Sequence, residues 1–421
     1  MTADARLRRD IGWNLVPVAL LAVVGLGLNF LIGGWWGPAA LGTFNLVTSA
    51  VFAFAVAGAF GLQYAVLRGV AEDPDDRDRV AAVVLGALLP GLALAAATTA
   101  VFVASRHALG ALLDSDAVAT GMLWAAPGLF CFALNKLLLG VVNGLRRMRA
   151  FAIYTSLRYL LIAVGLLIAR AARLDGEQLP VIWTFTEGTL LVVLVVELLA
   201  MVSLGRGRRT WLGWARQHLD YGARGVTATL AYEINSKLDV WMLGVALSDA
   251  QVGIYSLAAA LNEGAMQLAV VVQNNVNPVI ARELAAGRPA EVERLVARTR
   301  RWFVPAMVGI GIAGAALYPL IIPWLIGNQE FAGGSVPFAI MMGGLALASA
   351  YLPFNQALLM AHRPGWHTLY VLIIIAVSFA ANYALIPVLG LRGAAIAVAA
   401  SLVASAVALR VLVRARIGLR L

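Results

Sequence analysis

Long apolar runs recur along almost the whole chain, and no other feature constrains its fold as strongly. Of the 421 residues, 61% are hydrophobic and only 13% are charged, whereas a globular protein has about 25% charged residues. A helix needs about 20 mostly apolar residues to cross a bilayer. We therefore predict an all-α polytopic membrane protein with about 12 transmembrane helices, at 13–32, 43–66, 80–104, 119–144, 151–169, 181–204, 222–246, 253–280, 302–326, 336–361, 368–389 and 393–413.

The basic residues predict how these helices are oriented. The formal net charge is +10, and cytoplasmic loops of membrane proteins carry an excess of Arg and Lys. The even-numbered connections and the two termini hold about 25 of the 32 basic residues, whereas the odd-numbered connections hold about four. Both termini are therefore predicted to be cytoplasmic. The positive charge is assigned to orientation and contact with membrane lipids, and not to nucleic acid.

The small numbers of cysteines, lysines and histidines exclude several types of functional site. Cys131 is the only cysteine, so the chain has no disulfide framework or thiolate metal cluster. Lys136 and Lys237 are the only lysines, and each is followed by Leu, which excludes a G-x-x-x-x-G-K-[ST] phosphate loop. The four histidines form no H-x-x-x-H pair. We expect neither a cofactor nor a metal ion.

A short internal repeat divides the chain in two. The sequence L-G-T-F-N-L at 41–46 recurs as V-G-I-Y-S-L at 252–257, each before an even-numbered span. Such parallel repeats build transporters from two halves of similar topology. We predict two six-helix bundles, 1–205 and 221–421, joined by an interfacial linker at 206–220.

The second half resembles a known family. The segment 221–278 begins with Y-G, contains Asp239 in K-L-D-V-W-M-L-G, continues with V-G-I-Y-S-L-A-A-A-L and closes with N-P. The segment 382–397 reads N-Y-A-L-I-P-V-L-G-L-R-G-A-A-I-A. Both are similar to polysaccharide flippases, of the lipid-linked oligosaccharide or O-antigen type, in the multidrug/oligosaccharidyl-lipid/polysaccharide exporter superfamily.

This resemblance implies a fold and a function. The two bundles would form a V-shaped central cavity, and the protein would move undecaprenyl-(pyro)phosphate-linked oligosaccharide from the inner to the outer leaflet by alternating access. The location would be the bacterial cytoplasmic (inner) membrane. A glycan polymerase or glycosyltransferases would act nearby on the same polyprenyl-phosphate-linked glycan.

Charged side chains inside spans are the first functional candidates, because each costs roughly 2.5–3.5 kcal/mol to insert. Lys136 and Arg158 lie roughly 12 to 14 Å from the cytoplasmic ends of their spans, at 1.5 Å per residue. We predict that they bind the substrate phosphate at the inner mouth of the cavity. The alternative is that each extends to the interface and only packs there.

Four more charged residues are functional candidates, and the sequence leaves two possible roles open for each of them. Glu233 and Lys237 are four residues apart, so they either form a structural ion pair or serve coupling and substrate binding, respectively. Asp239 is predicted to be a gate or a structural contact. Glu187 is a coupling residue or packs between helices.

A polar stripe marks the span 253–280. Asn262, Gln267 and Asn274 are predicted to bind sugar hydroxyls, which need paired donors and acceptors, although hydrogen bonds between helices are the rival explanation. Glu263 is the best candidate for coupling to a proton or sodium ion, because a desolvated carboxylate can bind a proton more readily.

Two other functions compete with the flippase. A cation-coupled drug or metabolite antiporter of the same superfamily would have a more apolar, carboxylate-centred first bundle than one holding Lys136 and Arg158. A membrane glycosyltransferase or glycan polymerase would need acid and base residues on long outward loops. No outward connection exceeds roughly 15 residues, so we do not expect an enzyme.

Overall fold

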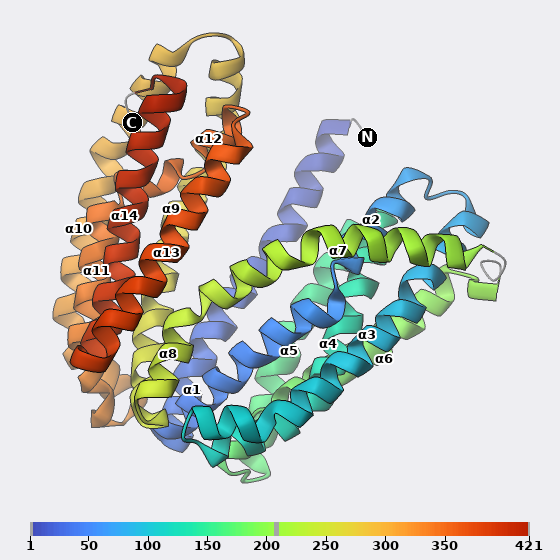
Figure 1. Cartoon of the computed structure of the whole chain (residues 1–421), viewed down its shortest axis with the longest axis horizontal. Helices are drawn as coiled ribbons and strands as arrows, with labels where there is room; N and C mark the ends of the chain where they lie inside the picture. Colours follow the sequence, from blue (N-terminus) through green and yellow to red (C-terminus); the bar gives the residue numbers. More distant parts are fainter. Residues whose placement is uncertain (1–2, 206–209, 420–421) are drawn as a thin grey trace. The chain divides into compact units, whose positions relative to one another are not determined.

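The protein is all-helical in the residues that its computed structural model describes, 3–205 and 210–419 (Figure 1). Arg206, Arg208, Arg209 and Arg420, and the side chains of Arg6, Arg8 and Arg9, lie outside the described parts. The helices are α1 Ala3–Ala59, α2 Leu62–Glu72, α3 Arg77–Leu112, α4 Asp116–Gly144, α5 Met148–Ala171, α6 Val181–Met201, α7 Trp211–Ser236, α8 Leu238–Ala246, α9 Asp249–Ala285, α10 Pro289–Ile326, α11 Ser335–Ala348, α12 Ala357–Met360, α13 Pro364–Leu389 and α14 Leu391–Ile417.

Ten helical segments among the described residues are long and apolar enough to cross a membrane, and the predicted all-α membrane fold is confirmed. Two of the twelve expected spans are not counted separately. The first two are merged in α1, which is kinked at Gly37 with φ 87°, a left-handed conformation that glycine adopts readily. The seventh is divided into α7 and α8 at Lys237, and neither piece is among the ten.

Polar caps set where several of these helices begin. The Asp76 side chain accepts hydrogen bonds from the backbone N–H groups of Asp78 and Arg79 at the start of α3. Ser115 accepts one from Val118 at the start of α4. Such caps satisfy N–H groups that have no partner inside the helix, so the boundaries follow from short polar segments between apolar runs.

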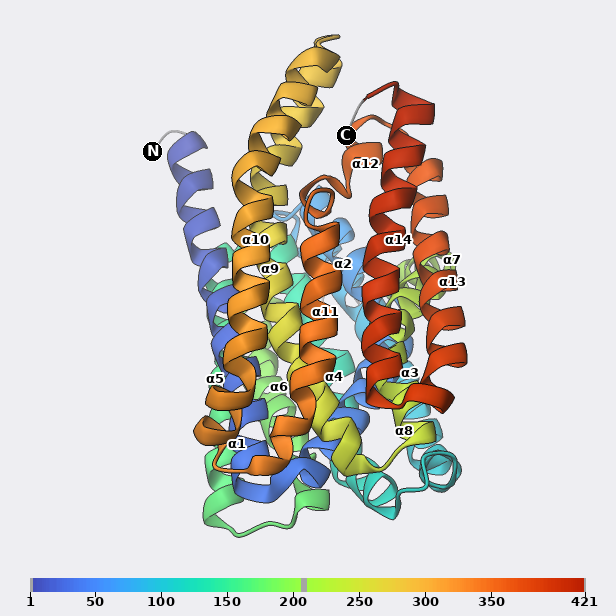
Figure 2. The ribbon, with the colours of Figure 1, turned by 90° about the vertical axis from the view of Figure 1, so that its left-hand side faces the viewer.

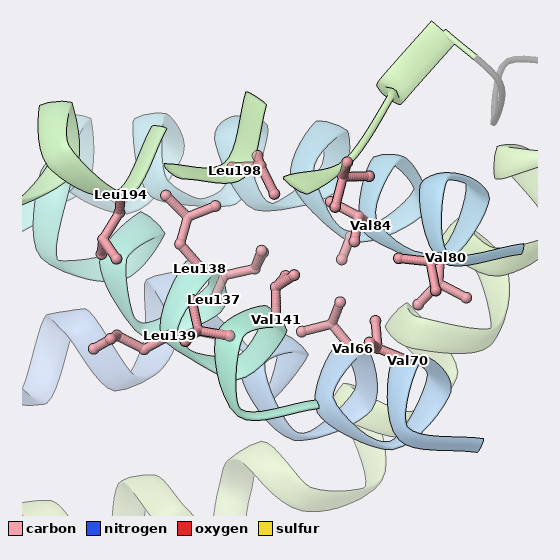
Figure 3. Close-up of a cluster of buried hydrophobic side chains, with 14 of the residues drawn as sticks. Val66, Val70, Val80, Val84, Leu137, Leu138, Leu139, Val141, Leu194 and Leu198 are labelled. Atoms are coloured by element: carbon pink, nitrogen blue, oxygen red, sulfur yellow. The ribbon is translucent and has the colours of Figure 1, made fainter. Parts of the chain in front are cut away.

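The chain divides into two compact units, and unit 1 comprises Met1–Trp36 and Thr43–Lys237. Its core contains aliphatic side chains from α2, α3, α4 and α6 (Figure 3), including Val66, Val84, Leu137 and Leu194. Helix α4 is the most enclosed of these, with buried residues along most of its length. It therefore supplies an interior face on which polar side chains can be held away from lipid.

Unit 2 comprises Gly37–Gly42 and Leu238–Leu421. Within it α10 packs on α11, α11 on α14, and α14 on α13 (Figure 2). Buried side chains of α9, α10, α13 and α14 form its core, with Phe354 and Leu358 fully enclosed.

The unit boundary at Lys237 lies further along the chain than the bundle boundary predicted at 205–221. The reason is that α7 packs against α2 and α3 of unit 1. A Cβ atom at Gly86 of α3 would lie 2.6 Å from the Cβ of Trp214 and 2.8 Å from the carbonyl oxygen of Trp211. This close approach fixes the described part of the predicted linker, residues 210–220, and the first part of the seventh span to unit 1.

The two glycines of the internal repeat, Gly42 and Gly253, approach each other inside unit 2. A Cβ atom at Gly42 would lie 1.8 Å from the Asp249 carbonyl oxygen, and one at Gly253 would lie 1.9 Å from the Pro38 carbonyl oxygen. Each glycine is also close to the other, since a Cβ on either would lie 2.9 Å from the backbone nitrogen of its counterpart. Pro38 and Asp249 are four residues before the two glycines, so both copies make the same contact with each other.

Candidate substrate site

A buried ion pair joins α5 and α6 within unit 1. Arg158 Nε lies 2.7 Å from Glu187 Oε1, and a terminal nitrogen of Arg158 donates a hydrogen bond of 3.2 Å to Oε2. The Glu187 side chain is 0% exposed and that of Arg158 is 13% exposed. A carboxylate this deep needs a partner, because an isolated buried charge is strongly unfavourable.

Helix α4 completes the partners of Glu187. The side-chain amide of Asn135 donates to Glu187 Oε2 at 2.8 Å and to the Glu187 backbone carbonyl at 2.9 Å. Asn135 is fully buried, so one amide holds both the carboxylate and the helix that carries it. Sequence reasoning missed Asn135, although an amide directly before Lys136 in an apolar run is a usable signal.

Lys136 lies in the same charged cluster. Its Nζ lies 5.0 Å from the centre of the Phe132 ring, and the guanidinium carbon of Arg158 lies 4.9 Å from that ring. Both distances are within the range of cation–π attraction. Glu233 of α7, Glu187 and Arg158 interact electrostatically with Lys136.

The structure therefore brings together four of the predicted site residues, which we call the unit 1 cluster: Lys136, Arg158, Glu187 and Glu233. Its two positive and two negative formal charges balance. Arg158 already holds a carboxylate, so a phosphate that reaches Arg158 must compete with Glu187. Lys237, by contrast, lies at the break between α7 and α8, and its spacing from Glu233 is not that of one continuous helix.

The predicted polar stripe of α9 divides between two faces. Glu263, Gln267 and Asn274 are exposed, whereas Asn262 is buried at 5% exposure. The amide of Asn277 on the buried side donates to Gln356 Oε1 at 2.8 Å. The buried face thus includes a hydrogen bond between elements of unit 2, and the exposed face presents polar groups to the surroundings.

Asp239 makes a contact within unit 2. The hydroxyl of Tyr255, which is fully buried, donates to Asp239 Oδ2 at 2.6 Å. This bond ties α8 to α9 directly beside the repeat glycine Gly253. Of the two predicted roles of Asp239, the geometry favours the structural contact.

No group of three or more His, Cys, Asp or Glu side chains that could hold a metal ion occurs among the residues that the structure describes. The site consists of charge pairs and amides inside apolar helices. Intramembrane charges of this kind mark ion and substrate pathways, so the fold and the cluster define a polytopic membrane protein of the transporter class.

Comparison with known proteins places the chain more narrowly. The chain belongs to the polysaccharide biosynthesis protein family, whose family model matches residues 7–283. This confirms the resemblance drawn from the sequence. A relative from Haloferax volcanii, the "Probable low-salt glycan biosynthesis flippase Agl15", is 21% identical over 398 residues, which cover 93% of this chain and 81% of the relative.

Solved structures agree on the fold. The lipid II flippase MurJ, in an inward closed conformation, matches 96% of this chain and 87% of its own with a TM-score of 0.76 at 12% identity. An inward-facing multidrug resistance transporter of the MATE family, in the MOP superfamily, matches 96% and 98% with a TM-score of 0.75 at 13% identity. These likenesses show the superfamily fold.

Proposed function

We propose that this protein is a flippase that moves a polyprenyl-(pyro)phosphate-linked oligosaccharide across the membrane by alternating access. The observation that carries the proposal is the exposed polar face of α9, where Glu263, Gln267 and Asn274 occupy a helix of membrane-spanning length. Amides in a span need water or polar partners, and sugar hydroxyls supply both donors and acceptors. The named glycan biosynthesis flippase relative supports the same substrate class.

The unit 1 cluster supplies the charge for the phosphate end of the substrate. Lys136 would make the first contact, because its ammonium group is a mobile point charge with three donors. Arg158 would then exchange Glu187 for a phosphate oxygen, since both acceptors suit the planar guanidinium group. Glu187 would be the coupling residue in this scheme, because its charge governs how strongly Arg158 is held.

The charge pattern supports a direction and a location of transport. The arginine-rich connections and both termini would face the cytoplasm, where enzymes assemble the prenyl-linked glycan, so movement would be from the inner to the outer leaflet of the cytoplasmic membrane. A proton or sodium gradient, or the membrane potential, would drive the cycle, with Glu263 as the coupling carboxylate of unit 2.

A gene-deletion experiment tests the proposal against the drug antiporter. Cells without the protein are expected to accumulate lipid-linked oligosaccharide that membrane-impermeant sugar-oxidising reagents cannot reach, and to lose surface glycan. Sensitivity to drugs should be unchanged. Normal surface glycan together with altered drug resistance would overturn the proposal and favour the antiporter.

A further inference from the structure

A groove of about 750 Å³ lies between α2 and α7, wholly within unit 1. Its volume is in the range of small-ligand sites. The walls carry two half-exposed tyrosines, Tyr64 and Tyr221, at 55% and 44% exposure. The groove is separate from the unit 1 cluster, because none of the four cluster residues lines it.

The backbone under the groove is held in place by close packing. A Cβ atom at Gly222 would lie 2.1 Å from the Phe60 carbonyl oxygen, so α7 crosses the chain directly before α2 at a distance that only glycine permits. His218 is buried, and its Nε2 lies 3.1 Å from the Val83 carbonyl oxygen of α3. The guanidinium carbon of Arg79 lies 5.2 Å from the centre of the Trp214 ring. These contacts preorganise the α7 wall.

Both walls of the groove carry a neutralised charge pair. On α2, Arg68 Nε lies 3.2 Å from Glu72 Oε1, and on α7 a terminal nitrogen of Arg224 lies 2.6 Å from Asp220 Oδ2. Glu72 also pairs with Arg79, so these ion pairs hold three arginines and two carboxylates. Planar donors and acceptors therefore line the groove, and each of these arginines already has a carboxylate partner.

This chemistry suits a polyhydroxyl ligand. Guanidinium and carboxylate groups donate to and accept from hydroxyls, and tyrosine offers an apolar ring face with a polar tip. Anionic lipid head groups instead bind clusters of several Arg and Lys side chains.

We propose that this groove binds sugar units of the lipid-linked oligosaccharide, as a glycan site additional to the transmembrane substrate site. The inference rests on the proposed function. It assigns sugar recognition to Tyr64 and Tyr221 and phosphate recognition to the unit 1 cluster, so the two ends of one substrate are read by different parts of unit 1.

The test is a binding measurement on the purified full chain in lipid nanodiscs, with three probes. The first is lipid-linked oligosaccharide extracted from membranes of the cells that make the protein. The second is undecaprenyl pyrophosphate without sugar, and the third is phosphatidylglycerol in the nanodisc. The variant is Tyr64→Ala with Tyr221→Ala, and Tyr383→Ala on α13, a tyrosine 70% exposed, is the matched control.

The double variant is expected to bind the lipid-linked oligosaccharide about tenfold more weakly, since two ring contacts of about 0.7 kcal/mol each give that factor. Binding of undecaprenyl pyrophosphate should stay unchanged. The variant with Tyr64→Phe and Tyr221→Phe should lose less affinity for the lipid-linked oligosaccharide than the double alanine variant. Unchanged glycan binding, equal loss for both prenyl probes, or selective loss of phosphatidylglycerol would each overturn the glycan site. Equal binding of both prenyl probes by the wild type would contradict the proposal that the lipid-linked oligosaccharide is the substrate.

Discussion

The guanidinium group of Arg158 and the carboxylate of Glu187 form an ion pair inside unit 1, at 2.7 Å between Nε and Oε1, with no solvent exposure of Glu187. Removing one partner of a buried pair costs about 3–5 kcal/mol, whereas replacing both by apolar residues of similar volume is often neutral. The pair can therefore be tested separately for its role in stability and its role in transport.

Arg158→Met should lower the thermal stability of the purified protein, at a cost of about 3 kcal/mol in the free energy of unfolding. Arg158→Met combined with Glu187→Leu should recover most of this stability, since no charge is left unpaired. If Arg158 also binds phosphate, the recovered double variant will still fail to transport. Wild-type transport by the double variant would assign Arg158 a structural role alone.

Lys136→Gln is expected to reduce transport about tenfold without lowering the amount of protein in the membrane, because one charge-assisted contact contributes about 1.5–3 kcal/mol. Lys136→Arg keeps the charge and serves as the matched control. Initial transport rates in vesicles, normalised to protein, measure the effect. Equal rates for Lys136→Gln and the wild type would contradict a phosphate contact at this residue.

Gly42→Ala and Gly253→Ala should each destabilise unit 2, because the added Cβ would lie less than 2 Å from a backbone carbonyl oxygen. Gly309→Ala on α10 is the control, since no atom lies within 4 Å of its Cβ position, and alanine there should stabilise the helix by about 0.5–1 kcal/mol. Thermal unfolding in detergent compares the three. Similar midpoints for all of them would contradict the close crossing.

His218 predicts a pH dependence of stability. Burial lowers the pKa of His218 from its ordinary value of 6.5, and the hydrogen bond with the Val83 carbonyl partly opposes this. Because the folded state binds the proton less well than the unfolded state, the stability is fully present above pH 6.5 and falls as the pH drops from there through the lowered pKa. His218→Gln should flatten thermal stability between pH 7.5 and 5. If His218→Gln has the same pH profile of stability as the wild type, His218 is not the cause of the pH dependence.

The spans and the family were predictable because composition and hydropathy act locally. A run of about 20 apolar residues is sufficient to predict a membrane helix, and the superfamily fold followed from the motifs around Asp239. The kink at Gly37 lies in the connection predicted between the first two spans. The break at Lys237 was not predicted, since it lies within a stretch that is continuously compatible with helix.

The partners of the charged residues could not be predicted from the sequence. Arg158 and Glu187 are on different helices, and their pairing depends on how α5 and α6 pack on α4. In the same way, the amides of α9 look alike in the sequence, and only packing divides buried Asn262 from exposed Gln267 and Asn274. Repeat spacing did relate Gly42 to Gly253, although not their direct contact.

The most direct test of the central claim is a translocation assay with the purified protein in proteoliposomes. Lipid-linked oligosaccharide is placed in both leaflets, and the fraction accessible to an external sugar-oxidising reagent is followed with time under a proton or sodium gradient. We predict a gradient-dependent rise in the accessible fraction from about one half toward completion, slowed about tenfold in the Lys136→Gln variant. An accessible fraction that stays at the level of protein-free liposomes under every gradient would contradict the account.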